Sequence, residues 1–116
     1  MTTPPPGTAE LVAECAALLP SLKWAPHESA RTHALLVVAG SDGRGGHVIV
    51  QRCRVDEPHR QYLVEVGHEA HSAAAGDTRT TGSAYASRWR EAYSIARDRY
   101  DAARAVVRPD FPEVVR

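Results

Sequence analysis

The stretch HVIVQRCRVDEPHRQYLVEVGHEAH, residues 47–71, decides the fold of this 116-residue chain. Two segments rich in β-branched and aromatic residues, HVIVQRCRV and RQYLVEVG, flank the tetrapeptide DEPH. Pro58 lacks a backbone N–H and prevents either strand from continuing through this link, so the pattern predicts a β-hairpin. The stretch also contains four of the six histidines and one of the two cysteines. It therefore raises the question of whether the hairpin carries a functional site.

A third strand precedes the hairpin. The segment THALLVVAG, residues 32–40, is almost continuously apolar, as expected for a strand that is covered on both faces. It is followed by SDGRGG, a turn sequence with several glycines that can adopt positive φ. Because both links are short, the three strands are predicted to form an antiparallel meander.

A helix is predicted on each side of these strands. The first begins at Thr8, a plausible N-cap, and stops near Pro20. The second has Ser83 as its candidate N-cap and ends before Pro109. Its apolar positions recur at helical spacing: Tyr85, Trp89, Ala92, Ala96, Tyr100, Ala103 and Val107.

The predicted architecture is a two-layer α+β domain with the order α-β-β-β-α. We expect residues 1–7 to form a disordered tail, residues 8–108 a single domain and residues 109–116 a C-terminal extension. The segments at 21–31 and 68–82 are expected to be loops.

The composition restricts the classes of function. The formal net charge is zero, from 14 basic and 14 acidic residues, so no global charge attracts the chain to nucleic acid or to an anionic membrane. No apolar run is long enough to span a membrane, and the N-terminus lacks the pattern of a signal peptide. A cytoplasmic location is expected, with Cys15 and Cys53 as buried, unpaired thiols.

The hairpin register predicts which side chains share a face. If Val55 faces Arg60, then Ile49 faces Val66 and His47 faces His68. One face, the expected core face, then carries Ile49, Cys53, Val55, Tyr62, Val64 and Val66. The opposite face carries Val48, Val50, Arg52, Arg54, Gln61, Leu63 and Glu65. A slip of one residue would exchange these faces.

The second face retains apolar side chains once two helices have covered the first. Contiguous exposed apolar surface often marks a protein–protein contact, and pairing about a two-fold axis is the commonest way to cover it. We therefore expect a non-enzymatic interaction module, homodimeric or bound to a protein partner. The candidate interface residues lie on this face and on the C-terminal helix: Leu35, Val37, Val48, Val50, Leu63, Trp89 and Tyr93. The alternative is that the helices or the segment around Trp24 cover both faces.

A metal site is a second hypothesis for the histidine-rich end of the hairpin. His47, His68 and His71, with carboxylates nearby, are the residue types that transition metals bind. The sequence matches no established metal motif, however, because HEAHS places its second histidine three residues after the first. We found no nucleophile motif, no acid–base pair and no cofactor motif in the chain.

Nucleic-acid binding is a third hypothesis. Arg90, Arg97 and Arg104 recur every seven residues, and Arg44 and Arg88 add positive charge. The order α-β-β-β-α resembles that of double-stranded-RNA-binding domains, with GGHVIV and SRWREAYSIA near the histidine loop and the basic helix start of that family. The resemblance implies phosphate contacts through the C-terminal helix. The chain departs from the family in lacking clustered lysines and in having a longer final helix.

Overall fold

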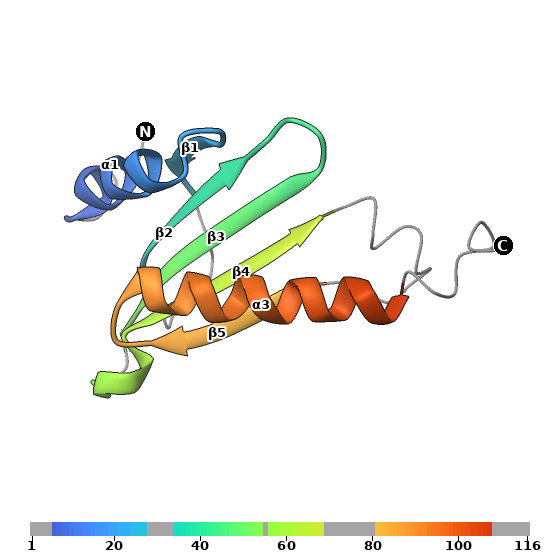
Figure 1. The fold of residues 1–116 in the computed structure, drawn as a ribbon. Helices are drawn as coiled ribbons and strands as arrows, with labels where there is room; N and C mark the ends of the chain where they lie inside the picture. Colours follow the sequence, from blue (N-terminus) through green and yellow to red (C-terminus); the bar gives the residue numbers. More distant parts are fainter. Residues whose placement is uncertain (1–5, 28–33, 55, 69–80, 108–116) are drawn as a thin grey trace, which may run out of the picture.

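The computed structural model describes residues 6–27, 34–54, 56–68 and 81–107 (Figure 1). Its elements are, in chain order, α1 (Thr8–Leu18), β1 (Lys23–Pro26), β2 (Ala34–Ser41), β3 (Gly46–Cys53), the 3₁₀ helix η1 (Pro58–Arg60), β4 (Tyr62–His68), β5 (Thr81–Ala86) and α3 (Trp89–Val107). The predicted α+β class, with one helix before and one helix after an antiparallel meander along the chain, is confirmed. The sheet has five strands rather than the three that were expected.

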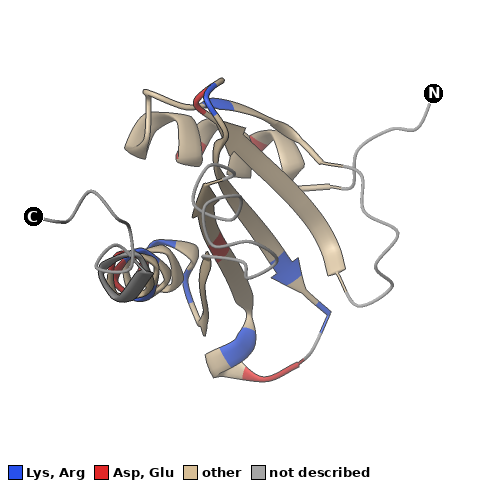
Figure 2. Cartoon of the chain, turned by 90° about the vertical axis from the view of Figure 1, so that its right-hand side faces the viewer, with Lys and Arg blue, Asp and Glu red and all other residues tan. Residues whose placement is uncertain are grey.

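The sheet is a simple meander in which every strand pairs with its neighbour in sequence, in the order β1-β2-β3-β4-β5. Helix α1 packs against β1 and β2, whereas α3 packs against β4 and β5. Both helices lie on the same side of the sheet (Figure 2). The other side, which we call the outer face, is not covered by either helix.

The sequence predicted neither β1 nor β5, because neither strand shows a clear alternation of large apolar and polar residues. Strand β1 has only four residues, KWAP, and ends in proline. In β5, TGSAYA, the inward residues are small: Gly82, Ala84 and Ala86 are all buried. The predictions that Ser83 caps the C-terminal helix and that Tyr85 begins its apolar stripe are wrong, because both residues belong to β5. The helix begins at Trp89.

The predicted hairpin register is wrong by one residue. Ile49 pairs with Glu65 rather than Val66, and Arg52 rather than Cys53 pairs with Tyr62. The cause is the link between the strands, in which η1 adds a helical turn where a tight turn was expected. The shift exchanges the two faces of β3, as expected from the two-residue period of a strand.

The hydrophobic core lies between the helices and the inner sheet face. Its sheet residues form cross-strand rows, of which the central one is Val38, Val50, Val64 and Ala84. Val48 and Val50, which were expected on the outer face, are 5% and 0% exposed within this core. Leu11 and Cys15 join it from α1, and Trp89, Ala92, Ala96 and Tyr100 join it from α3.

The two cysteines are buried and free, as predicted. Burial, together with the nearby Glu14 carboxylate, raises the pKa of the Cys15 thiol to about 12, so this side chain is neutral at physiological pH. The turn between β2 and β3 is confirmed as well. Gly43 and Gly45 have φ of 76° and 97°, and Oδ1 of Asp42 accepts hydrogen bonds from the N–H groups of Arg44 (2.6 Å) and Gly46 (3.0 Å).

Several predictions concern segments outside the described residues. These are the disordered tail, except for Pro6 and Gly7, most of the loop at 68–82 including His71, and the C-terminal extension. Neither of the helices that the model describes is long and apolar enough to cross a membrane.

Candidate functional site

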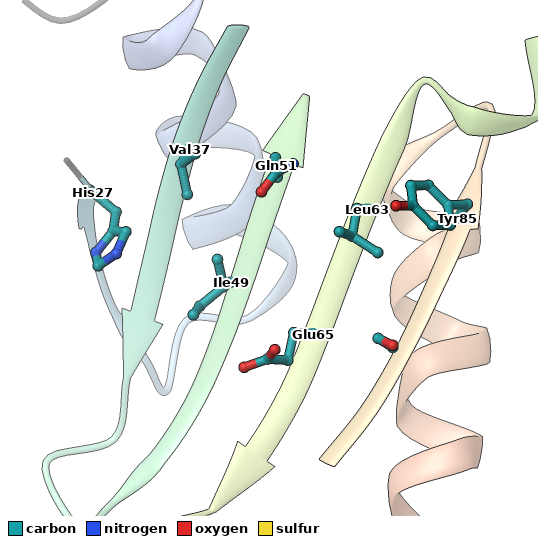
Figure 3. Close-up of a pocket in the computed structure, with 8 residues that line it drawn as sticks. His27, Val37, Ile49, Gln51, Leu63, Glu65 and Tyr85 are labelled. Carbon is teal, nitrogen blue, oxygen red and sulfur yellow. The ribbon is translucent and has the colours of Figure 1, made fainter. Parts of the chain in front are cut away.

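The outer face presents two rows of side chains across the central strands. The first outer row consists of Val37, Gln51, Leu63 and Tyr85, and the second outer row consists of Ala39, Ile49, Glu65 and Ser83. These residues alternate with the core residues along each strand, so their side chains extend away from the helices. Figure 3 shows all of them except Ala39 on the side of the sheet opposite α1 and α3.

The two rows enclose a hollow of about 240 Å³. Its lining includes one residue from the end of β1 and residues from all four other strands: His27, Val37, Ile49, Gln51, Leu63, Glu65, Ser83 and Tyr85 (Figure 3). Val37 is 7% exposed at its floor, whereas Tyr85 is 46% exposed at its rim. Gln51, which is 2% exposed, is also buried in the hollow, so its floor combines an amide with an apolar side chain. The volume falls below the ~300 Å³ at the lower end of ordinary ligand pockets.

A histidine–glutamate pair stands at one end of the hollow. Nε2 of His47 and Oε2 of Glu65 lie 3.1 Å apart, and about a third of each side chain is exposed. The glycine at position 67 makes room for this pair, because a Cβ there would lie only 2.8 Å from Cε1 of His47. Glu65 is the single carboxylate among the lining residues, and none of them is lysine or arginine.

The opposite corner of the hollow is formed by Tyr85. The guanidinium carbon of Arg60 lies 5.0 Å from the centre of the Tyr85 ring, within the range of a cation–π contact. This contact connects η1 to β5 and supports the ring at the edge of the sheet. The exposed tyrosine therefore has one side already occupied by a basic residue of the same chain.

Both edges of the sheet are protected against pairing with another strand. At the β5 edge, Nη1 of Arg99 donates a 2.8 Å hydrogen bond to the carbonyl oxygen of Ser83, which occupies an outward-facing backbone acceptor. At the other edge, β1 is four residues long, begins with Lys23 and ends with Pro26. Short strands, lysine and proline are common devices that prevent edge-to-edge association. A partner is therefore more easily accommodated on the outer face than at an edge.

The predicted interface residues are not all on one surface. Val37 and Leu63 lie in the first outer row, and Leu35 is exposed at an irregularity of β2. The predicted placement of Val48 and Val50 on this face is wrong. Trp89 and Tyr93 face inward: Trp89 is 4% exposed, and Tyr93 is half-buried against the core. Trp89 is therefore a core residue, whereas the Tyr93 hydroxyl reaches the surface and accepts a 3.0 Å hydrogen bond from Nη1 of Arg97.

The predicted cross-strand pair of His47 and His68 does not form. His47 pairs with Gly67 and His68 pairs with Gly46, so the two imidazoles extend from opposite faces of the sheet. His71, the third proposed ligand, lies outside the described residues. Within residues 6–27, 34–54, 56–68 and 81–107, no three His, Cys, Asp or Glu side chains are grouped as a metal site requires.

The predicted arginine surface is divided. Arg44 lies in the turn between β2 and β3, and Arg88 directly precedes α3. The turn and the start of α3 are at opposite ends of the sheet (Figure 1). Arg90 stacks on the Trp89 ring at 5.8 Å. Nε of Arg97 lies 3.6 Å from Oδ2 of Asp101, so part of its charge is neutralised within the helix. Arg104 lies in the last turns of the same helix.

Sequence reasoning placed Val37, Leu63 and Glu65 on the outer face but missed the other five lining residues: His27, Ile49, Gln51, Ser83 and Tyr85. A usable signal was present in β5, where Ser83 and Tyr85 alternate with three small residues. Ile49 was assigned to the core because the predicted register between β3 and β4 was shifted by one residue. His27 follows a strand too short to be recognised from its sequence.

Comparisons with protein-family models, curated proteins and solved structures found no match to this chain. The functional argument therefore depends on the outer face itself.

Proposed function

We propose that this chain is a small interaction domain that self-associates through its outer face. The single observation that carries the proposal is that, among the described residues, neither helix covers the sheet face on which the half-buried Ile49 and Leu63 lie. Apolar surface of this kind is usually covered by a protein partner. A second copy is the commonest partner, since most soluble oligomers are symmetric homo-oligomers.

The size of the face limits the strength of this association. The sheet is about 19 Å wide, from four inter-strand spacings of about 4.8 Å, and its longest strands extend about 27 Å. The projected area is about 500 Å², below the ~800 Å² per partner of a stable interface of standard size. Association also costs at least about 4 kcal/mol in lost translational and rotational freedom. We therefore expect a concentration-dependent dimer with a dissociation constant in the micromolar range.

The proposal is tested by Leu63→Arg, with Ile95→Arg as its matched control. Leu63 is half-buried in the outer face, whereas Ile95 is 36% exposed on α3. Both variants add the same charge, so only the location differs. Light scattering over a range up to about 1 mM should show dimerisation of the unchanged chain and of Ile95→Arg, and its loss in Leu63→Arg.

Circular dichroism of both variants checks that the fold is retained. A monomeric mass for the unchanged chain over the whole concentration range would overturn the proposal, as would equal weakening by the two substitutions.

A further inference from the structure

We propose that the hollow in the outer face binds a small organic cation, a primary ammonium group on an apolar body about the size of one aromatic ring, with the Glu65 carboxylate as its anchor. This inference goes beyond the proposed self-association and does not depend on it. Its starting observation is the charge of the lining. Among the eight residues that line the hollow, Glu65 is the single carboxylate, and none is lysine or arginine.

Glu65 is held in position and still has an oxygen available. Its Oε2 lies 3.1 Å from Nε2 of His47, which fixes one side of the carboxylate. Among the described residues, no hydrogen bond or ion pair involves Oε1. About a third of the side chain is exposed, and Figure 3 shows the carboxylate extending from β4 toward β3 beside Ile49. A ligand can therefore reach Glu65 without first displacing His47.

An ammonium group suits this acceptor better than a guanidinium does. A guanidinium binds a carboxylate best through two parallel hydrogen bonds, one to each oxygen, and His47 already occupies Oε2. An ammonium is a compact charge with three N–H donors, for which a single oxygen is sufficient. The exposed Ser83 lies directly opposite Glu65 on β5. Its hydroxyl is a second acceptor within reach, since opposite residues of paired strands have Cβ atoms about 4.5–5.5 Å apart.

The apolar part of the ligand has a place beside this anchor. Ile49 lies directly opposite Glu65 on β3, and Leu63 precedes Glu65 by two residues on the same face of β4. Tyr85 is diagonal to Glu65 across β4 and β5, at about 7–8 Å, and Figure 3 shows its ring directed toward Leu63. A short linker would span this distance, so we place the ring of the ligand against Leu63 and Tyr85 and its ammonium group at Glu65.

The volume of the hollow limits the size of the ligand. A hollow of about 240 Å³ corresponds to the liquid volume of about eight water molecules. A ring with a two-carbon amine can be accommodated there, whereas a peptide or a nucleotide is too large. Because so few groups contact a ligand of this size, we expect a dissociation constant in the millimolar range.

Other classes of ligand fit the hollow less well. An anion would be repelled by Glu65, with no lysine or arginine in the lining to offset the repulsion. A neutral apolar molecule would desolvate the carboxylate without offering it a donor. A metal ion would lack ligands, since in the described part of the chain no three His, Cys, Asp or Glu side chains are grouped.

The test is a titration with phenethylamine, followed through the methyl resonances of Ile49 and Leu63. The concentration of the chain is held constant, so that a shift reports binding of the ligand and not self-association. We expect saturable shifts with a dissociation constant of about 1–10 mM. Phenethyl alcohol, which has the same body without the charge, should bind at least about ten-fold more weakly. Phenylacetate, an anion of similar size, should produce no saturable shift.

Glu65→Gln identifies the anchor, with Glu91→Gln as its matched control on the exposed surface of α3. We expect Glu65→Gln to weaken phenethylamine binding at least about ten-fold and Glu91→Gln to leave it unchanged, with circular dichroism confirming that both variants are folded. Absence of a saturable shift with phenethylamine up to about 50 mM would overturn the proposal, as would equal affinity for the amine and the alcohol or equal effects of the two substitutions. Self-association is measured without ligand, so either proposal can fail while the other stands.

Discussion

At the scale of single residues, Gly82 determines how closely α3 approaches the sheet. A Cβ at this position would collide with the backbone oxygen of Ala96 and the backbone nitrogen of Tyr100. Ala92 and Ala96 are both fully buried, so the facing surface of the helix is also made of small side chains. Helix and strand therefore pack with no space for an additional methyl group.

We predict that Gly82→Ala lowers the stability of the domain by about 2–3 kcal/mol, because rigid backbone on both sides prevents relaxation. For a domain of this size, the corresponding fall in the melting temperature is roughly 8–20 °C. Ser83→Ala is the matched control, since Ser83 is exposed on the same strand and should stay within about 0.5 kcal/mol of the unchanged chain. Thermal unfolding followed by circular dichroism measures both. A melting temperature for Gly82→Ala equal to that of the control would contradict this packing.

At the scale of elements, α1 is the least firmly attached part of the described fold. Only Thr8, Leu11 and Cys15 are buried along its length. Its connection to the other helix is a 2.9 Å hydrogen bond from Nε1 of Trp89 to Oε1 of Glu14. A bond of this kind to a charged acceptor contributes about 1.5–3 kcal/mol at most, less where water competes for the carboxylate.

We predict that Glu14→Ala lowers the free energy of opening α1 by about 1 kcal/mol and leaves β3 and β4 almost unchanged, because the lost hydrogen bond joins α1 to Trp89 of α3 and involves neither strand. Hydrogen exchange of backbone amides measures the two regions in one experiment. Glu10→Ala, a substitution of another exposed glutamate on the same helix, is the control. Equal loss of protection in α1 and the central strands would show that the helix does not open separately.

The residue composition of the individual helices and strands explains how much of the fold could be predicted. The two helices and the three central strands have large apolar residues at regular spacing, and they were found. Strand β5 was missed because close packing against α3 requires Gly82, Ala84 and Ala86, which carry almost no hydrophobic signal. The predicted apolar stripe of the C-terminal helix began at Tyr85 because this residue lies four positions before Trp89. Tyr85 belongs to β5 instead.

The outer face could be predicted only in part for a related reason. In β3, Val48, Ile49 and Val50 are all apolar, so alternation alone cannot determine which of them face the helices. The register decides this, and it depends on the η1 turn, which the sequence PHR does not indicate clearly. The existence of a half-apolar second face was predicted, whereas its members on β3 were exchanged with those of the core.

At the scale of the whole molecule, the fold has two layers, the helices and the sheet, and the outer face of the sheet could pack against a further layer. Helices cover one face of the sheet, the edges are protected by Arg99, Lys23 and Pro26, and no described helix covers the outer face. A second copy on this face would complete a four-layer arrangement of helices, sheet, sheet and helices. The central claim is therefore that association occurs at the outer face and not at an edge or on a helix.

The alternation of the three central strands provides the most direct test of this claim. Each has one methyl-bearing residue in the outer face beside one in the core: Val37 beside Val38, Ile49 beside Val50, and Leu63 beside Val64. Methyl resonances recorded by nuclear magnetic resonance while the protein is diluted from about 1 mM will report on both sets in one sample. The account predicts that the signals of Val37, Ile49 and Leu63 shift with concentration while those of their core neighbours stay fixed. Concentration-independent signals from all six residues would contradict it.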